Sequence, residues 1–90
     1  ISRAQGNFLQ GVRVQRFNGP SGLREVALSW HDASVGVQML TVPSNPAANT
    51  WSWRRIQALS QGEDLSTGDL DGDGDLDLVL GTVWIENPSW

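Results

Sequence analysis

Nine consecutive residues, from Asp69 to Asp77, constrain the folding of this chain more than any other feature. They carry a carboxylate at every second position, and Gly72 and Gly74 stand between the central ones. Carboxylates this close together repel one another, and without a cation the repulsion opposes folding. Glycine lets the backbone curl tightly, so that alternate acids can converge on one point. The segment therefore predicts a metal-binding loop rather than an acidic turn without an ion.

Calcium is the expected metal, because this hard cation takes about six to eight oxygen ligands from carboxylates and carbonyls. Magnesium is less suitable, since it keeps several of its waters. An EF-hand is excluded, because its loop needs a glutamate at the twelfth position, where Leu80 stands in this chain. The expected ligands are the side chains of Asp69, Asp71 and Asp73, the carbonyl of Asp75, and the closing carboxylate of Asp77.

The rest of the chain is typical of short β-strands separated by turns. Helix signals are poor, apolar runs are short, and the 90 residues include ten glycines and four prolines. We predict an all-β fold with strands at about residues 11–16, 24–29, 36–42, 52–59, 65–69, 77–81 and 83–87. The acidic loop then joins two neighbouring strands.

A weak internal repeat organises these strands. Residues 5–9, 17–19, 25–29 and 36–43 align, in the same order, with residues 61–65, 70–72, 77–81 and 81–88. Two copies of a four-stranded unit indicate blades of a β-propeller. We assign repeat 1 to about residues 5–59 and repeat 2, in which the fourth strand is missing, to about residues 61–90 of a single domain. Unpaired strand edges invite association, so we expect either neighbouring blades of a longer chain or a homo-oligomer that closes the ring.

Charge and composition exclude several classes of partner. The net charge is −4, and seven of the ten acids lie between Glu63 and Asp77. No basic patch is available to neutralise phosphates, so we expect no nucleic acid. No segment approaches the roughly 18 consecutive apolar residues of a membrane span, so we expect no membrane insertion. The absence of cysteine excludes disulfides as a source of stability.

The order strand, acidic loop, strand, followed by the Gly-Thr-Val-Trp-Ile-Glu-Asn-Pro stretch at residues 81–88, resembles the FG-GAP/VCBS repeat family. The resemblance is specific over about residues 63–88 and diffuse over residues 5–43. It implies integrin-α-like, calcium-binding propeller blades, an extracellular or cell-surface location, and a role in adhesion or ligand binding. The first copy departs from the pattern, because Arg16 and Pro20 stand where the second copy has aspartates, and we expect no metal there.

A ligand surface is expected on the side of the ring away from the acidic loop. In a four-stranded blade, the loop between strands two and three and the connection to the next blade lie on that side. The residues that these loops contribute are Trp30, His31, Asp32, Glu63 and Asp64. Trp53 and Trp84 are instead expected in a core or in the packing between blades.

These features predict a non-catalytic, calcium-stabilised extracellular module that binds carbohydrate or protein. His31 beside Asp32 looks like half of a catalytic dyad, but adjacent strand residues point to opposite faces, and no activated nucleophile accompanies them. Two alternatives remain open. The chain could be the propeller part of a polysaccharide-degrading enzyme such as a lyase, or a self-assembling propeller fragment with no ligand of its own.

Overall fold

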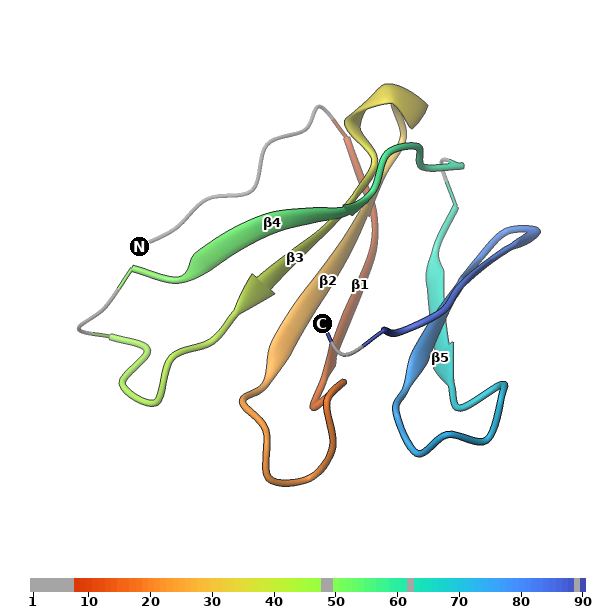
Figure 1. The fold of residues 1–90 in the computed structure, drawn as a ribbon. Helices are drawn as coiled ribbons and strands as arrows, with labels where there is room; N and C mark the ends of the chain where they lie inside the picture. The colour runs from red at the N-terminus through yellow and green to blue at the C-terminus, as the bar shows by residue number, and fades with distance from the viewer. Residues whose placement is uncertain (1–7, 48–49, 62, 89) are drawn as a thin grey trace.

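A computed structural model describes residues 8–47, 50–61, 63–88 and 90, and these form seven β-strands and one short 3-10 helix (Figure 1). The strands are β1 (Leu9–Gln15), β2 (Glu25–Trp30), β3 (Val37–Thr41), β4 (Ser52–Gln57), β5 (Leu65–Gly68), β6 (Asp77–Leu80) and β7 (Val83–Ile85), and the helix η1 covers Ala33–Val35. The predicted all-β class is confirmed, and each predicted strand overlaps an observed one. Within the described residues no helix combines the length and apolar character needed to span a membrane.

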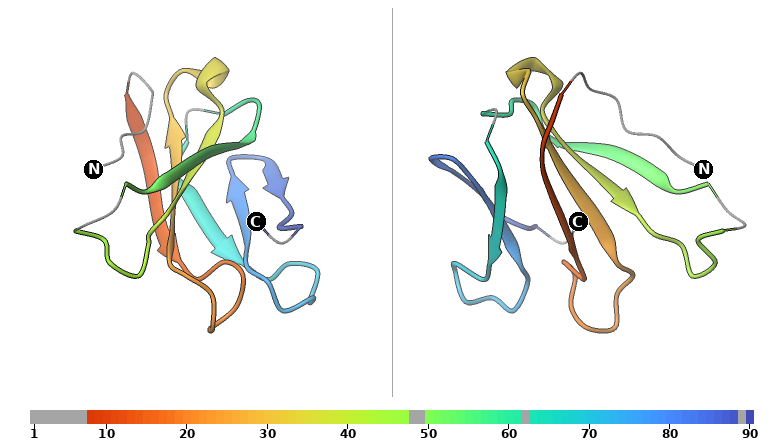
Figure 2. Two further views of the ribbon diagram at one scale, coloured as in Figure 1. Left: turned by 60° about the vertical axis from the view of Figure 1, so that its left-hand side comes forward. Right: turned by 180° about the vertical axis from the view of Figure 1, so that it is seen from behind.

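The strands form two separate antiparallel sheets, with strand orders β1-β2-β3-β4 and β5-β6-β7. Every neighbouring pair is consecutive in the chain, so each sheet is a simple meander. Seen from the back, the two sheets form facing layers (Figure 2). The repeat boundaries at residues 5–59 and 61–90 stay a prediction, and residues 5–7 lie outside the described part of the chain.

The main core lies between the two sheets. Strands β2 and β3 contribute Ala27, Val37 and Met39, while the second sheet contributes a matching layer of leucine and isoleucine. Successive residues of a strand point to opposite faces, so positions two apart, such as Val37 and Met39, share the inward face. The buried residues of this core are Phe17, Ala27, Val37, Met39, Leu65, Leu78, Leu80 and Ile85.

The outer face of the first sheet carries a second apolar cluster, which consists of Leu28, Trp30 and Leu40 with partly buried neighbours. The sequence led us to expect Trp30 on an exposed ligand surface. That prediction is wrong, because only 8% of the Trp30 surface is exposed. Its ring N–H has no hydrogen-bond partner among the described residues. Trp53 and Trp84 lie in neither core cluster, and 40% and 49% of their surfaces are exposed. Of the two roles predicted for them, a place in a core is therefore wrong, and packing between blades stays a prediction.

The two sheets approach most closely where β1 passes β5, and Gly11 permits this approach. A Cβ atom at this position would overlap the Asp64 carboxylate and would lie 2.7 Å from the Leu65 nitrogen and 2.8 Å from the Ser29 hydroxyl. The Ser29 hydroxyl also donates a 2.6 Å hydrogen bond to the Glu63 carbonyl, which joins β2 to the segment that leads into β5. Any side chain larger than hydrogen at position 11 would separate the sheets.

A buried carboxylate, that of Glu25, links two strands of the first sheet to the turn that follows β1. Glu25 is 2% exposed, and its carboxylate accepts a 2.6 Å bond from Arg54, which comes from β4. The Thr41 hydroxyl and the Asn18 amide donate to the same carboxylate at 3.1 and 3.2 Å. This carboxylate is thus satisfied by three donors from three different parts of the chain.

Candidate metal centre

The acidic segment forms the connection between β5 and β6, as predicted. It lies at the same end of the molecule as the β1–β2 connection (Figure 1). Gly72 and Gly74 adopt φ values of 76° and 95°, a left-handed region that side chains rarely enter. The space around both glycines is open, so backbone conformation and not crowding requires glycine at these two positions. They bend the loop sharply between β5 and β6.

Backbone N–H groups turn toward the carboxylates within this loop. Asp69 accepts from the nitrogens of Gly72 and Asp73 on one oxygen, at 2.9 and 3.1 Å, and from Gly74 on the other, at 2.9 Å. Asp71 accepts from the Asp73 nitrogen at 3.2 Å, and Asp73 accepts from the Asp75 nitrogen at 2.9 Å. These local bonds replace the sheet pairing that the loop cannot make, and they hold it curled.

Asp77 ties the loop to the body of the protein. It is fully buried, and its two oxygens accept separate hydrogen bonds from the Leu70 nitrogen at 3.1 Å and the Asn87 nitrogen at 2.9 Å. The buried Asn87 amide in turn donates to the carbonyls of Phe17 at 2.8 Å and Leu76 at 3.1 Å. Asp77 and Asn87 therefore connect the acidic loop to the chain that follows β1.

Three of the five predicted ligands converge. Asp69, Asp71 and Asp77 each offer a carboxylate oxygen, and these oxygens all lie within 4.8 Å of one another. Two oxygens bound to one calcium can be at most about 5 Å apart, twice the metal–oxygen distance. This group could hold a metal ion, although its geometry is not specific to calcium. Asp73 and Asp75 do not belong to this convergent group.

Crowding in the loop changes the acidity of its carboxyl groups. Loss of solvation, together with hydrogen bonding to the carboxyl groups of Glu86 and Asp73, raises the pKa of Asp71 to about 6. Burial alone would raise the pKa of Asp77, but hydrogen bonds from Asn87 and Leu70 outweigh it, and its pKa is lowered. The Asp71 carboxylate is thus costly to ionise, whereas the charged form of the Asp77 carboxylate is well stabilised. Hydrogen bonds therefore preorganise Asp77 as an anionic ligand, and Asp71 is not preorganised in this way.

The metal-free protein should therefore become more stable as the pH falls from 7 to 5. Between the ordinary aspartate pKa of 3.8 and about 6, Asp71 binds more protons in the folded state than in the unfolded state. Its contribution to stability thus decreases as the pH rises through that window. The Asp77 contribution is present above 3.8 and is lost as the pH falls below that value.

Melting temperatures in a chelator, measured from pH 7 to pH 3, will show this as a maximum near pH 4, where the gain from Asp71 and the loss from Asp77 balance. Saturating calcium should reverse the trend between pH 7 and pH 5, because protons then compete with the metal for the carboxylates. A melting temperature that falls steadily below pH 7 in the chelator would contradict the prediction.

Sequence reasoning missed Glu86 and Asn87 as parts of this centre. Both follow β7, which brings them beside the loop although the chain separates them from Asp71 by more than a dozen residues. Glu86 had appeared only within the stretch that resembles a known family.

The second predicted site, at the opposite end of the molecule, is brought together only in part. His31 is exposed, and its ring bonds to the Gln10 side chain at 3.0 Å. Asp32 is exposed, and the hydroxyl and nitrogen of Ser34 bond to its carboxylate and lower its pKa. Glu63 is exposed, and the exposed Asp64 pairs with Arg13 at 3.3 Å. Trp30 is buried and is no part of an exposed surface. A role in ligand binding stays a prediction for the other four residues, which are His31, Asp32, Glu63 and Asp64.

Comparison with known proteins adds no assignment, since no family model, no curated protein and no solved structure matches this chain.

Proposed function

We propose that the loop from Asp69 to Asp77 binds one calcium ion, and that the ion stabilises a propeller-type binding module. The convergence of three carboxylate oxygens within 4.8 Å carries the proposal. Calcium–oxygen distances of about 2.3–2.6 Å accommodate that spread, and we propose calcium rather than magnesium because magnesium prefers few protein ligands and keeps several of its waters. The positive charge of the ion would favour the ionised form of Asp71, whose pKa is raised chiefly by loss of solvation.

Exposed apolar residues on the first sheet support packing against further sheets. Val12, Val14 and Trp53 lie on its outer face and are 38%, 52% and 40% exposed. Contiguous apolar surface of this kind is typical of an interface. The edge strands β4 and β7 also have backbone groups available for pairing. We therefore propose that the two sheets act as blades beside neighbouring blades, from a longer chain or from other copies of this one.

The module is proposed to act outside the cell, without catalysis of its own, by binding carbohydrate or protein. Extracellular modules bind calcium with dissociation constants of about 10⁻⁴ to 10⁻³ M. At millimolar calcium such a site contributes on the order of 0.5–1.5 kcal/mol of stability. A site of this strength would be filled outside cells and largely vacant at the low calcium level of the cytosol.

A calcium titration followed by melting temperature and light scattering tests the proposal. We expect millimolar calcium to raise the melting temperature by about 2–10 °C, and magnesium to raise it less. Asp69→Asn should abolish the calcium-dependent rise, because Asp69 supplies one of the three converging carboxylate oxygens. Asp32→Asn is the matched control, since this exposed aspartate directly precedes the helix η1, which lies at the end of the molecule away from the acidic loop (Figure 1). Equal melting temperatures in chelator and in 10 mM calcium would refute the metal site, and light scattering reports the oligomer independently.

A further inference from the structure

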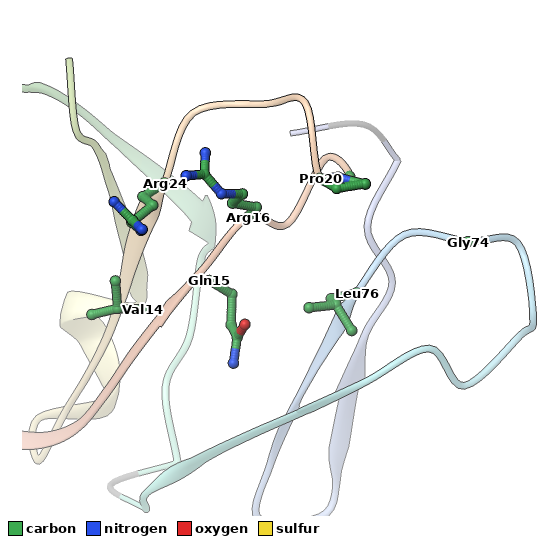
Figure 3. A pocket seen from close by; sticks show the side chains of 8 residues that line it. Val14, Gln15, Arg16, Pro20, Arg24, Gly74 and Leu76 are labelled. Atoms are coloured by element: carbon green, nitrogen blue, oxygen red, sulfur yellow. The ribbon is translucent and has the colours of Figure 1, made fainter. Parts of the chain in front are cut away.

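A groove separates the acidic loop from the connection between β1 and β2. Its volume is about 410 Å³, within the range of ligand sites. Figure 3 shows Arg16 and Arg24 along one wall, with Leu76 and Gly74 of the acidic loop on the opposite side. A second hollow of about 300 Å³ is also lined by Arg16 and Arg24, so the two arginines lie between two adjoining hollows.

The charge of this groove is opposite to that of the chain. The net charge of the chain is −4, yet no aspartate or glutamate is among the residues that line either hollow. Arg16 donates a 2.7 Å bond to the Gly22 carbonyl, which orients its guanidinium but leaves the charge uncompensated. The side chain of Arg24 makes no hydrogen bond or ion pair with the described residues.

Two other arginines of this protein, unlike Arg16 and Arg24, form ion pairs with carboxylates. Arg13 pairs with Asp64 and Arg54 pairs with Glu25. The carboxylate of Glu25, although adjacent to Arg24 in the chain, belongs to the buried network with Arg54. The two groove arginines are therefore free to bind an external anion. Guanidinium groups bind carboxylates by parallel N–H donors, which supplies direction as well as charge.

The lining on either side of the arginines identifies the class of ligand. The larger hollow adds Val14, Pro20 and Leu76, and the smaller one adds Leu23, Val42, Pro43 and Pro46. These aliphatic surfaces would accept apolar side chains. No aromatic ring lines either hollow, so the stacking platform that sugar rings favour is missing there.

We propose that this groove binds an acidic peptide segment, with a carboxylate between Arg16 and Arg24 and an apolar residue in each hollow. The inference deepens the proposed function, on which it rests for the role as a binding module, and it selects a protein ligand over carbohydrate. It also places the ligand at the end of the molecule that carries the acidic loop, not at His31 and Asp32.

Fluorescence anisotropy with a labelled synthetic peptide of the pattern Gly-Leu-Glu-Leu-Gly, in millimolar calcium, tests the groove. The same peptide with glutamine in place of glutamate is the neutral probe. We expect the acidic peptide to bind at least about tenfold more tightly, as a charged hydrogen-bonded pair requires. Arg24→Gln should remove that tenfold preference, and rising salt should reduce it.

Arg55→Gln is the matched control, because it makes the same charge change at an exposed residue of β4 that lines neither hollow. Because the Arg24 side chain has no hydrogen bond or ion pair with the described residues to lose, its variant should fold; the melting temperature verifies this, and Arg16→Gln provides a second variant. Equal affinity for the two peptides, no binding of either, an equal loss in Arg55→Gln, or stronger competition by oligogalacturonate than by the unlabelled peptide would each overturn the proposal. The calcium-dependent melting temperature in the same buffer shows separately whether the metal site has failed.

Discussion

Asp77→Ala should be the most damaging single substitution in the acidic loop, and it should destabilise the protein even in a chelator. The Asp77 carboxylate is buried and accepts from the nitrogens of Leu70 and Asn87. Removing it leaves these two donors without partners, at a cost of about 1–3 kcal/mol for each. A loss of about 2–5 kcal/mol is a large share of the stability of a small domain. Urea denaturation of the metal-free variant measures it directly.

The loss should also spread beyond the loop, because Asn87 bonds both to Asp77 and to the carbonyl of Phe17. Asp75→Ala is the matched control. It removes a charge from the same loop, but the Asp75 carboxylate is outside the convergent group, and the carbonyl proposed as a ligand remains. We expect that control to be neutral or slightly stabilising without metal, since it relieves repulsion. Equal destabilisation by the two variants in a chelator would show that Asp77 has no structural role beyond its charge.

Arg54→Met should cost more stability than Glu25→Gln, although the two residues form one ion pair. Glu25 is buried, whereas 35% of the Arg54 side chain is exposed. Without arginine, a buried carboxylate loses its charged partner, and breaking a buried pair in this way costs about 3–5 kcal/mol. Without the glutamate charge, Arg54 can turn toward solvent, so we expect a loss of only about 1–2 kcal/mol.

A double-mutant cycle in urea measures this asymmetry. The variant with both substitutions should be more stable than Arg54→Met alone, because no unpaired carboxylate remains. Arg55→Met, at the neighbouring exposed position, should change stability by less than about 0.5 kcal/mol. If Glu25→Gln were the more damaging change, then Arg54 and not Glu25 would be the buried member of the pair in solution.

Local patterns were sufficient to predict most of the secondary structure. Short apolar runs and frequent turns indicated the strands, because glycine and proline end regular structure after only a few residues. The acidic loop was equally readable, since its glycines and its repulsive charges restrict it to a curled form. Both are properties of neighbouring residues, and neither needs knowledge of what packs against them.

The partners of these elements could not be read in the same way. Nothing near Trp30 in the chain indicates that it is buried, and nothing near Asp71 indicates that Glu86 lies beside it. Arg54 pairs with Glu25, 29 residues away, only because β3 lies between β2 and β4 in one sheet. The sequence by itself determined the strands and the acidic loop, since both follow from short-range stereochemistry and charge. The tertiary structure alone decided which carboxylates converge, which arginines stay unpaired and which tryptophans are exposed, because these depend on how distant segments pack.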